Sequence, residues 1–512
     1  MEELQMKKVT VIINVLLLLS ISLVFAGGGQ QKGSASTSGS GDLRYQGSIT
    51  MYAQAYSPDT PTATRPNPPT KFREVAAQWQ ALHPGITINF IANLEAGQDY
   101  MTWIKTRLAG GAAPDIFWAQ YYDLYMGGIP AGSFYQLNQY LERPNKYIPG
   151  NSRWLDTFQK ALITQTSGIN GEINYINADY VGTMVVYNVA MFKRAGIDFQ
   201  IRTWSDYTRA CQMLKAAGIT PWAWAFGNAG EAAEYFTFFT RLYATNMYYN
   251  DFEKLAVRGG KNALSLSPVE VSIAIKNGYF SPSDPRFIGF WANIKDHIDN
   301  YMPRDSVSPA INNQTILNMF INQQIAMNWN GSWVNNDLKA ANVSFEYSSF
   351  PMPIPDTASF SQATNFDSSP AIGGPSAAWQ YAISTPLANN TMNSDKLEAV
   401  LDWLMFITTP ENNSAIVNDL GAFIPTIIGA KPLPANAELV RMLEAEPKVI
   451  DIGPLSLGTE AMQAFYREFQ DYALGNQTLE QAGRKIMEVF DRTADDVISK
   501  ADFDVTPYLN KR

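Results

Sequence analysis

Cysteine and histidine are almost absent from this sequence, which has one cysteine and two histidines in 512 residues. The single cysteine, Cys211, cannot form an intramolecular disulfide, and a His/Cys metal site would have too few ligands. Clusters of basic residues are also missing: 38 Lys and Arg stand against 47 Asp and Glu, a net charge of −9. Nucleic-acid binding needs clustered cations, so we expect no nucleic-acid partner, and we predict neither a metal nor a cofactor.

The usual catalytic motifs are missing as well. There is no G-x-S-x-G elbow for a nucleophilic serine and no G-x-x-x-x-G-K-[ST] phosphate loop. We expect Cys211 to pack inside a helix, His83 to cap a helix end, and His297 to lie on the solvated face of a helix over 287–301. The pattern favours a protein that is not an enzyme. A carbohydrate-active enzyme remains the alternative, because no spacing singles out a carboxylate pair among 47 acids.

Aromatic residues are plentiful by contrast. The chain has 12 Trp, 25 Tyr and 27 Phe, or 12% of all residues, within a composition that is 46% hydrophobic and 17% charged. Such a composition is globular, and the length allows two large domains or about three ordinary ones. Some of these rings must lie at the surface or in a groove.

The first 26 residues predict a secretory signal. Lys7 and Lys8 precede an apolar run over 15–25 that ends at Val24-Phe25-Ala26. We expect a signal peptide over 1–26 that is cleaved after Ala26, with an uncleaved anchor as the alternative. Position 27 is Gly rather than Cys, so no lipid is expected. Residues 27–42 predict a flexible Gly/Ser linker, and the location predicted for the mature protein is the periplasm.

Strands and helices are predicted to alternate along the chain, which indicates an α/β fold with parallel strand pairing. In the first part, strands are expected at 49–53, 86–90 and 116–118, with helices at 72–79 and 100–108. In the second part, strands are expected at 181–187, 220–226, 325–329, 343–350 and 380–384. Further helices are expected at 189–195, 204–217, 231–246, 287–301, 312–322, around 397–404 and from a Thr478/Gln481 capping box to about 497.

Two tryptophans follow predicted strands and have polar neighbours. Trp118 is followed by Gln120, Tyr121 and Tyr122, and Trp333 is preceded by Asn330 and Ser332. Ligands of open α/β sheets bind beyond the carboxyl ends of strands. Flat aromatic faces beside amides and hydroxyls suit a sugar. The pairs Tyr121-Tyr122 and Tyr248-Tyr249 leave tyrosinate ligation of ferric iron, or another small solute, as an alternative.

Several segments, taken in order, resemble the family 1 extracellular solute-binding proteins. This family contains the sugar-binding components of ABC importers and includes maltose-binding protein. The segments are HPGITINFI (83–91), LAGGAAPDIFWAQ (108–120), YNVAMFKRAGID (187–198), QQIAMNWNGSW (323–333), YAIS (381–384) and GAFIPT (421–426).

The resemblance implies a two-lobed periplasmic-binding-protein fold of class II type, with the ligand cleft between lobes that are joined by crossing segments. Lobe 1 would comprise 43–180 and 375–430, and lobe 2 would comprise 181–374 and the helical 431–512. Extra residues are expected around 247–312. The residues that the resemblance and the strand ends assign to the ligand are Tyr56, Asp59, Trp118, Gln120, Tyr121, Tyr122, Tyr180, Tyr235, Asn330, Ser332 and Trp333.

The expected protein is therefore the monomeric binding component of an ABC importer, which delivers a carbohydrate to membrane permease subunits. An oligosaccharide is expected as the ligand. Charged residues that follow the tryptophan in the maltose binder are replaced here by Tyr121 and Tyr122, so maltose itself is not expected.

Overall fold

The structure is a computed structural model. It describes residues 43–59, 68–94, 99–120, 124, 128–168, 171–225, 240, 243–258, 266–308, 311–363, 378–436, 440, 457, 459–501 and 503–509. The predicted signal peptide and linker lie outside these residues. Within the described ranges, no helix is both long enough and apolar enough to cross a membrane.

Among the described residues, the first sheet has five strands in the order β2-β1-β3-β9-β4. Its strands are β1 (Gly47–Met51), β2 (Ile86–Phe90), β3 (Ile116–Trp118), β4 (Ile176–Asn177) and β9 (Gln380–Ile383). β1 pairs in parallel with β2 and with β3, whereas β9 runs antiparallel to β3 and β4. The parallel pairing predicted for the first part of the chain is confirmed.

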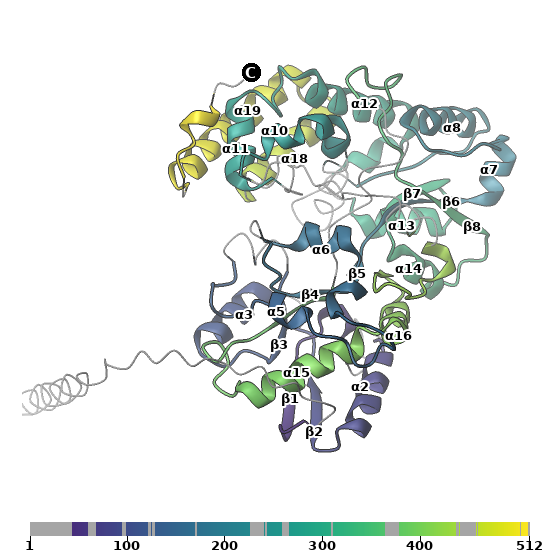
Figure 1. Ribbon diagram of the computed structural model, residues 1–512. Coiled ribbons are helices and arrows are strands. Elements are labelled where there is room, and N and C mark those ends of the chain that lie inside the picture. The colour runs from purple at the N-terminus through teal and green to yellow at the C-terminus, as the bar shows by residue number, and fades with distance from the viewer. Residues whose placement is uncertain are drawn as a thin grey trace, which may run out of the picture. The chain divides into compact units, whose positions relative to one another are not determined.

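Helices cover both faces of this sheet, because neighbouring strand residues point to opposite sides. Ile116 packs with α2 (Lys71–Leu82) and α15 (Ser394–Ile407), whereas Phe117 packs with α3 (Tyr100–Ala109). His83 is the C-cap of α2, as predicted. In Figure 1, β1 and β2 lie with α2 and α15.

A buried ion pair ties β3 to α15. Asp115 is fully buried, and its Oδ1 lies 2.7 Å from the Nζ of Lys396, which is almost fully buried. Thr50 donates to Asp115 from both its backbone nitrogen and its hydroxyl, and the Asn389 amide donates as well. A buried carboxylate is tolerated when it is paired and hydrogen-bonded in this way.

The second sheet contains β7 (Met327–Gly331), β6 (Thr183–Asn188) and β8 (Tyr347–Pro351) in the order β7-β6-β8, with antiparallel pairing. Its two faces are also covered. Val185 packs with α8 (Trp204–Ala216), while Met184 and Val186 pack with α13 (Asn313–Ile321) and α14 (Val334–Ala340). α7 (Val189–Ala195) follows β6 directly.

The strand predicted at 220–226 is wrong for the described residues. Only an isolated parallel bridge joins Trp222 to Met327, and residue 226 lies outside the described ranges. The carbonyl of Thr220 accepts from Ala326, just before β7, and that of Pro221 accepts from Met327 of β7, but proline has no N–H with which to continue a ladder. The strand predicted at 343–350 begins only at Tyr347.

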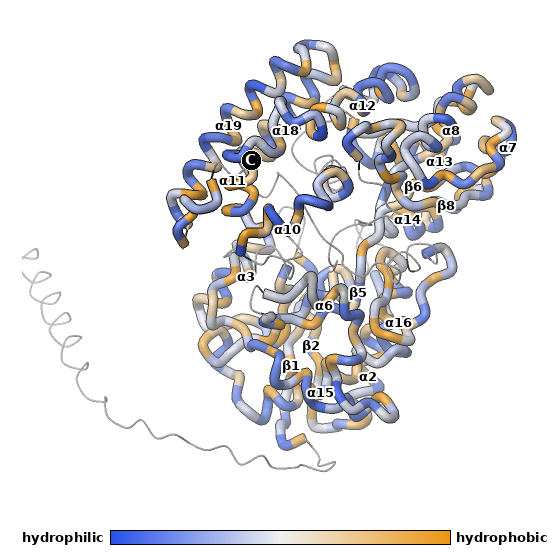
Figure 2. The backbone as a smooth tube through the Cα atoms, turned by 45° about the horizontal axis from the view of Figure 1, so that its top comes forward, coloured by the Kyte–Doolittle hydropathy of each residue, from blue (hydrophilic) through white to orange (hydrophobic). Residues whose placement is uncertain are grey.

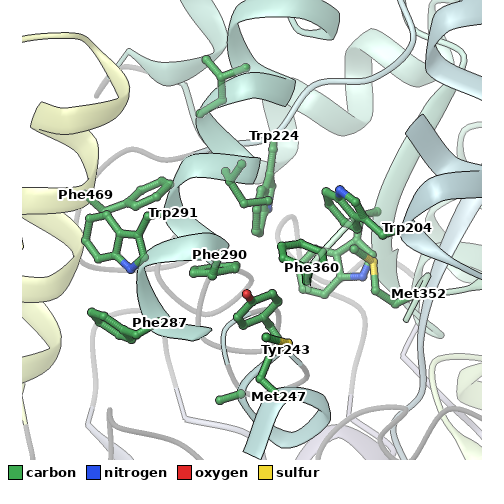
Figure 3. Packing of buried hydrophobic residues seen from close by; sticks show 14 of the residues in the cluster. Trp204, Trp224, Tyr243, Met247, Phe287, Phe290, Trp291, Met352, Phe360 and Phe469 are labelled. Carbon is green, nitrogen blue, oxygen red and sulfur yellow. The ribbon is translucent and has the colours of Figure 1, made fainter. Parts of the chain in front are cut away.

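Long helices complete the hydrophobic core beside the second sheet. They are α11 (Pro268–Lys276), α12 (Pro285–Tyr301), α18 (Thr459–Ala473) and α19 (Leu479–Ser499). Trp291 of α12 packs its ring against Phe465 and Phe469 of α18, at 5.0 and 4.5 Å between centroids. Figure 3 shows Trp291 beside Phe469. Hydrophobic and hydrophilic residues alternate along α18 and α19 (Figure 2). The predicted capping box of Thr478 and Gln481 starts α19.

His297 was expected on a solvated face, and this prediction is wrong: its side chain is 1% exposed. His297 shares one stripe of α12 with Phe290 and Ile294, which lie seven and three residues before it and are buried too. Its Nε2 lies 2.9 Å from the Thr208 hydroxyl. Burial lowers the pKa of the imidazole to about 3. Cys211 packs inside α8, as predicted, and burial raises the pKa of its thiol.

Two short strands pair with each other outside the two larger sheets, and the first of them lies between β4 and β6 in the chain. β5 (Asp179–Tyr180) pairs antiparallel with β10 (Ile424–Pro425), with Tyr180 opposite Ile424 and Asp179 opposite Pro425. Around them, the Asn413 amide donates to the carbonyl of Ala178.

The other described elements are short, apart from α16. They are η1 (Gln54–Tyr56), α5 (Asn138–Leu141), η2 (Trp154–Thr157), α6 (Lys160–Thr166), η3 (Tyr249–Asp251), α10 (Phe252–Leu255), η5 (Arg304–Val307), α16 (Pro410–Leu420), η6 (Pro434–Asn436) and η8 (Thr506–Tyr508). Most of the helix predicted at 231–246 lies outside the described residues, and 243–248 are helical.

Candidate functional site

Four aromatic side chains gather where β1 and β3 end, and we call them the first aromatic group. Tyr52 follows β1, Trp118 ends β3, and Tyr100 and Trp103 lie in the first turn of α3. The Tyr100 ring stacks on Tyr52 at 5.0 Å between centroids and meets Trp118 at 5.2 Å. Tyr52 also lies 5.3 Å from Trp103. The group is therefore continuous across two strand ends.

Trp118 keeps part of its surface exposed, whereas Tyr52 is buried. The Tyr100 hydroxyl donates to the backbone carbonyl of Trp118 and so fixes the end of β3. The Arg107 guanidinium lies 4.7 Å from the Trp103 ring centroid, a cation–π contact at the edge of the group. The indole N–H of Trp118 is buried and has no acceptor among the described residues.

Beyond Trp118 the chain turns sharply at Gln120, whose φ of +43° is left-handed. Its side chain is partly exposed. The next two predicted site residues, Tyr121 and Tyr122, lie outside the described ranges. Asp59, in the segment after β1, is also partly exposed, and its Oδ1 accepts from the backbone nitrogen of Asn93 at 3.3 Å.

Tyr56 is fully buried behind these strand ends rather than exposed beside them. Its hydroxyl donates to Asp179 Oδ2 at 2.8 Å, and the backbone nitrogen of Ala378 donates to the same oxygen at 2.9 Å. Burial and the nearby Asp179 carboxylate raise the pKa of Tyr56 well above its ordinary value. Tyr180, the next residue along β5, is fully buried and packs with the core of the second sheet.

The end of β7 carries the other predicted site residues. Asn330 is buried, and its side-chain amide donates to Asn328 Oδ1 at 3.0 Å. The hydroxyl of Ser332 donates to the carbonyl of Ala422 at 2.7 Å, which joins β7 to the segment before β10.

Trp333 is partly exposed and lies over the backbone of Gly331. A Cβ at position 331 would meet the Trp333 ring at 2.0 Å, so only glycine fits beneath it. The Trp333 ring thus occupies the space that a side chain at position 331 would fill.

The structure brings Trp118 together with three aromatic residues that the sequence interpretation missed: Tyr52, Tyr100 and Trp103. Tyr52 lies inside the strand predicted at 49–53, whereas the structure ends β1 at Met51, so the predicted strand does not indicate its place at a strand end. Tyr235 lies outside the described ranges, so its predicted role is not placed.

Of the two tyrosine pairs suggested as ligands of ferric iron, Tyr248-Tyr249 lies in the described ranges, and the contacts of Tyr248 there are not those of a metal ligand. Tyr248 is buried, donates to Asp284 at 3.0 Å, and packs beneath Arg286, 4.2 Å from its ring centroid. Within the described ranges, no group of three or more His, Cys, Asp and Glu side chains could hold a metal ion.

Comparison with known families and structures accounts for this architecture. Residues 63–414 match the model of the bacterial extracellular solute-binding proteins, so the chain belongs to this family of binding proteins. The resemblance inferred from the sequence is confirmed, and so is the two-lobed α/β fold. The family implies an extracytoplasmic location.

Solved structures with the same fold share little sequence with this chain. A chitin oligosaccharide binding protein is 19% identical, with a TM-score of 0.57 over 88% of this chain and 99% of its own. A family 1 extracellular solute-binding protein from Bifidobacterium longum subsp. infantis is 16% identical, with a TM-score of 0.60 over 87% and 98%. A substrate-binding protein from Listeria monocytogenes, solved with cycloalternan, is 17% identical, with a TM-score of 0.54 over 88% and 100%. The comparison with curated proteins gives no match.

Proposed function

We propose that this protein is the binding component of an ABC importer and that its ligand is a carbohydrate, in particular an oligosaccharide. The observation that carries the proposal is the first aromatic group, which extends over two neighbouring strand ends and leaves Trp118 partly exposed beside the uncharged Gln120. Aromatic faces suit the C–H faces of sugar rings, and uncharged amides suit their hydroxyls. The chitin oligosaccharide binding protein and the cycloalternan-bound protein of the same fold support the same ligand class.

The predicted site residues divide by exposure. Asp59, Trp118, Gln120 and Trp333 are partly exposed, and we propose that they contact the ligand together with Tyr121, Tyr122 and Tyr235. The buried residues shape the site from behind by hydrogen bonds or packing; they are Tyr56, Tyr180, Asn330 and Ser332. The proposed lobes are 43–180 with 375–430, and 181–374 with 431–512.

The proposal also covers export of the protein and delivery of its ligand. The signal is cleaved after Ala26, and the mature monomer works in the periplasm, where it passes its ligand unchanged to the permease subunits. Intact-mass measurement of the exported protein should begin at Gly27. A mass that retains 1–26 favours the anchor instead.

The test of ligand class is a thermal-shift screen of the purified chain. Raffinose, chitotriose, acarbose and cycloalternan should be compared with ferric ion and with phosphate. A ligand that binds only the native state raises the melting temperature. At a ligand concentration of 100 times the Kd, the free energy of unfolding rises by about 2.7 kcal/mol. A shift with ferric ion alone supports the iron receptor. Chromatography of the sugars after incubation separates binding from hydrolysis, because an enzyme would shorten the oligosaccharide.

A substitution at Gly331 tests whether the end of β7 takes part. The Cβ of Gly331→Ala must displace the Trp333 ring, at a cost of about 1–3 kcal/mol for overpacking. If Trp333 stacks on the ligand, calorimetry should show weaker sugar binding by Gly331→Ala. Gly289→Ala is the control, because a Cβ at position 289 would make only ordinary contacts at 3.9 Å and the backbone there is not left-handed. Unchanged affinity in Gly331→Ala, with Trp333 shown to have moved by near-ultraviolet circular dichroism, contradicts a role for Trp333.

A further inference from the structure

The two strand ends that carry the first aromatic group repeat the same three residue types. β1 is followed by Tyr52-Ala53-Gln54, and β3 ends at Trp118, which is followed by Ala119-Gln120. The tripeptide aromatic-Ala-Gln occurs at these two places in the 512 residues and nowhere else. Because β1 and β3 are parallel neighbours with Met51 opposite Ile116, the two copies lie at the same edge of the sheet, offset by one residue.

Both glutamines have a backbone conformation that ordinary residues avoid. Gln54 has φ +53° and Gln120 has φ +43°, in the left-handed region where a Cβ is disfavoured. Glycine would adopt either turn without strain. Strain of this kind persists where the surrounding structure imposes it, and it concentrates at ligand sites.

Consecutive residues of β9 hold the two turns. The carbonyl of Gln380 accepts from the backbone nitrogen of Ala119 at 2.7 Å, and the hydroxyl of Tyr381 donates to the carbonyl of Ala53 at 3.1 Å. Both alanines are fully buried. The residue before each glutamine is therefore anchored to the same strand, so each turn begins from a fixed point.

In both copies, the aromatic ring and the glutamine side chain have similar surroundings. The aromatic rings of Tyr52 and Trp118 both contact the ring of Tyr100. Each glutamine side chain is partly exposed. The Gln54 carboxamide oxygen accepts from its neighbour Ala55, while the Gln120 carboxamide has no hydrogen-bond partner among the described residues.

We propose that Gln54 and Gln120 are the paired hydrogen-bonding residues of one carbohydrate subsite, in which the ligand ring stacks on the exposed part of the first aromatic group. This inference rests on the proposed function. A carboxamide offers one acceptor and two donors and carries no charge, so it matches neighbouring hydroxyl groups, each of which donates and accepts. The subsite therefore selects a neutral sugar ring with two adjacent hydroxyls over an anionic or deoxygenated one.

The test uses two substitutions at position 120. Gln120→Gly removes the amide and relieves the backbone strain, whereas Gln120→Ala removes the amide and keeps the strain. The probe is the tightest-binding sugar among raffinose, chitotriose and acarbose, measured by calorimetry on the full exported chain. Both variants should bind roughly tenfold more weakly, the equivalent of about 1.4 kcal/mol. The melting temperature of sugar-free Gln120→Gly should equal or exceed that of the wild type. Gln54→Gly should behave in the same way.

Asn342→Gly is the matched control, since Asn342 has φ +49° at an exposed turn after α14. It relieves the same kind of strain and should leave sugar affinity unchanged. Wild-type affinity in Gln120→Gly and Gln120→Ala overturns the inference while the proposed function stands. A loss of affinity in Gln120→Gly alone also overturns it, because the backbone rather than the amide would then matter. No binding of any probe by the wild type contradicts the proposed function, and the inference with it.

Discussion

The protein contains two aromatic assemblies that differ in position and in exposure. The first aromatic group lies at the carboxyl ends of β1 and β3, and Trp118 in it is partly exposed. The second assembly surrounds His297 with Trp204, Tyr207 and Trp222, all buried, between α8 and α12. Rings that are covered on every side can only stabilise the fold, whereas rings at a strand end can also receive a ligand. Position and exposure, rather than the number of aromatics, separate the two roles.

The largest effect expected is on the second assembly. Trp222 is 1% exposed, and its indole N–H has no hydrogen-bond partner among the described residues, so its contribution is packing. Trp222→Ala should lower the free energy of unfolding by about 3–5 kcal/mol and leave the ligand Kd within about twofold. Urea denaturation and calorimetry measure the two quantities. A large loss of affinity in a stable Trp222→Ala protein would falsify the contrast.

The same assembly should make stability depend on pH. Because the folded pKa of His297 is about 3, below its ordinary 6.5, the unfolded chain binds a proton first as the pH falls. The contribution is complete above pH 6.5 and is lost, at about 1.4 kcal/mol per pH unit, as the pH falls from about 6.5 towards 3. Denaturation of the wild type and of His297→Phe between pH 7 and pH 4 isolates this effect. Parallel curves for the two proteins would show that His297 is not its source.

Trp118→Ala should have the opposite effect to that expected for Trp222→Ala: weaker ligand binding with nearly unchanged stability. We expect ligand binding to weaken by about 2 kcal/mol, or roughly 30-fold in Kd, with a melting temperature close to that of the wild type in the absence of ligand. A sharply lowered melting temperature with normal affinity would move Trp118 into the same class as Trp222.

The smallest effect tests the support beneath Trp118. Tyr100→Phe keeps the ring that contacts Tyr52 and Trp118 but removes the hydrogen bond to the Trp118 carbonyl. A net contribution of about 0.5–1.5 kcal/mol is expected for such a bond. Affinity should fall by a few fold in Tyr100→Phe, and further in Tyr100→Ala. Equal affinities in the wild type and both variants would limit the site to Trp118 alone.

Much of the fold could be predicted because it depends on local periodicity. The alternation at 86–90 and the helical spacing from Phe72 to Trp79 each predict an element that the structure contains. Pro221 shows the limit: an apolar run predicts a strand, but the missing N–H stops the ladder. His297 shows a second limit of sequence-based prediction. Its burial depends on which face of α12 packs against α8, and local sequence does not specify this tertiary contact.

The candidate site was predictable only in part for the same reason. Trp118 and Trp333 could be found one strand at a time. The contact of Tyr100 with both Tyr52 and Trp118, by contrast, joins residues from three elements. The burial of Tyr56 depends on Asp179, which lies 123 positions away in the sequence.

The hydrogen bonds around β5 locate the pivot of any rotation between the two sheets. Asp179 is bound to Tyr56 and Ala378 on the first-sheet side, while the carbonyl of Gly182 accepts from Ser332 on the second-sheet side. Only the two residues between these anchors, 180 and 181, are left to absorb a change of backbone dihedral angles. On the neighbouring connection, Ala422 is held by Ser332, Thr426 by Ala178 and Ile427 by Asn413, which leaves 423–425. Because the two segments pair with each other as the antiparallel strands β5 and β10, a rotation confined to them would bend the chain about one direction and resist twisting.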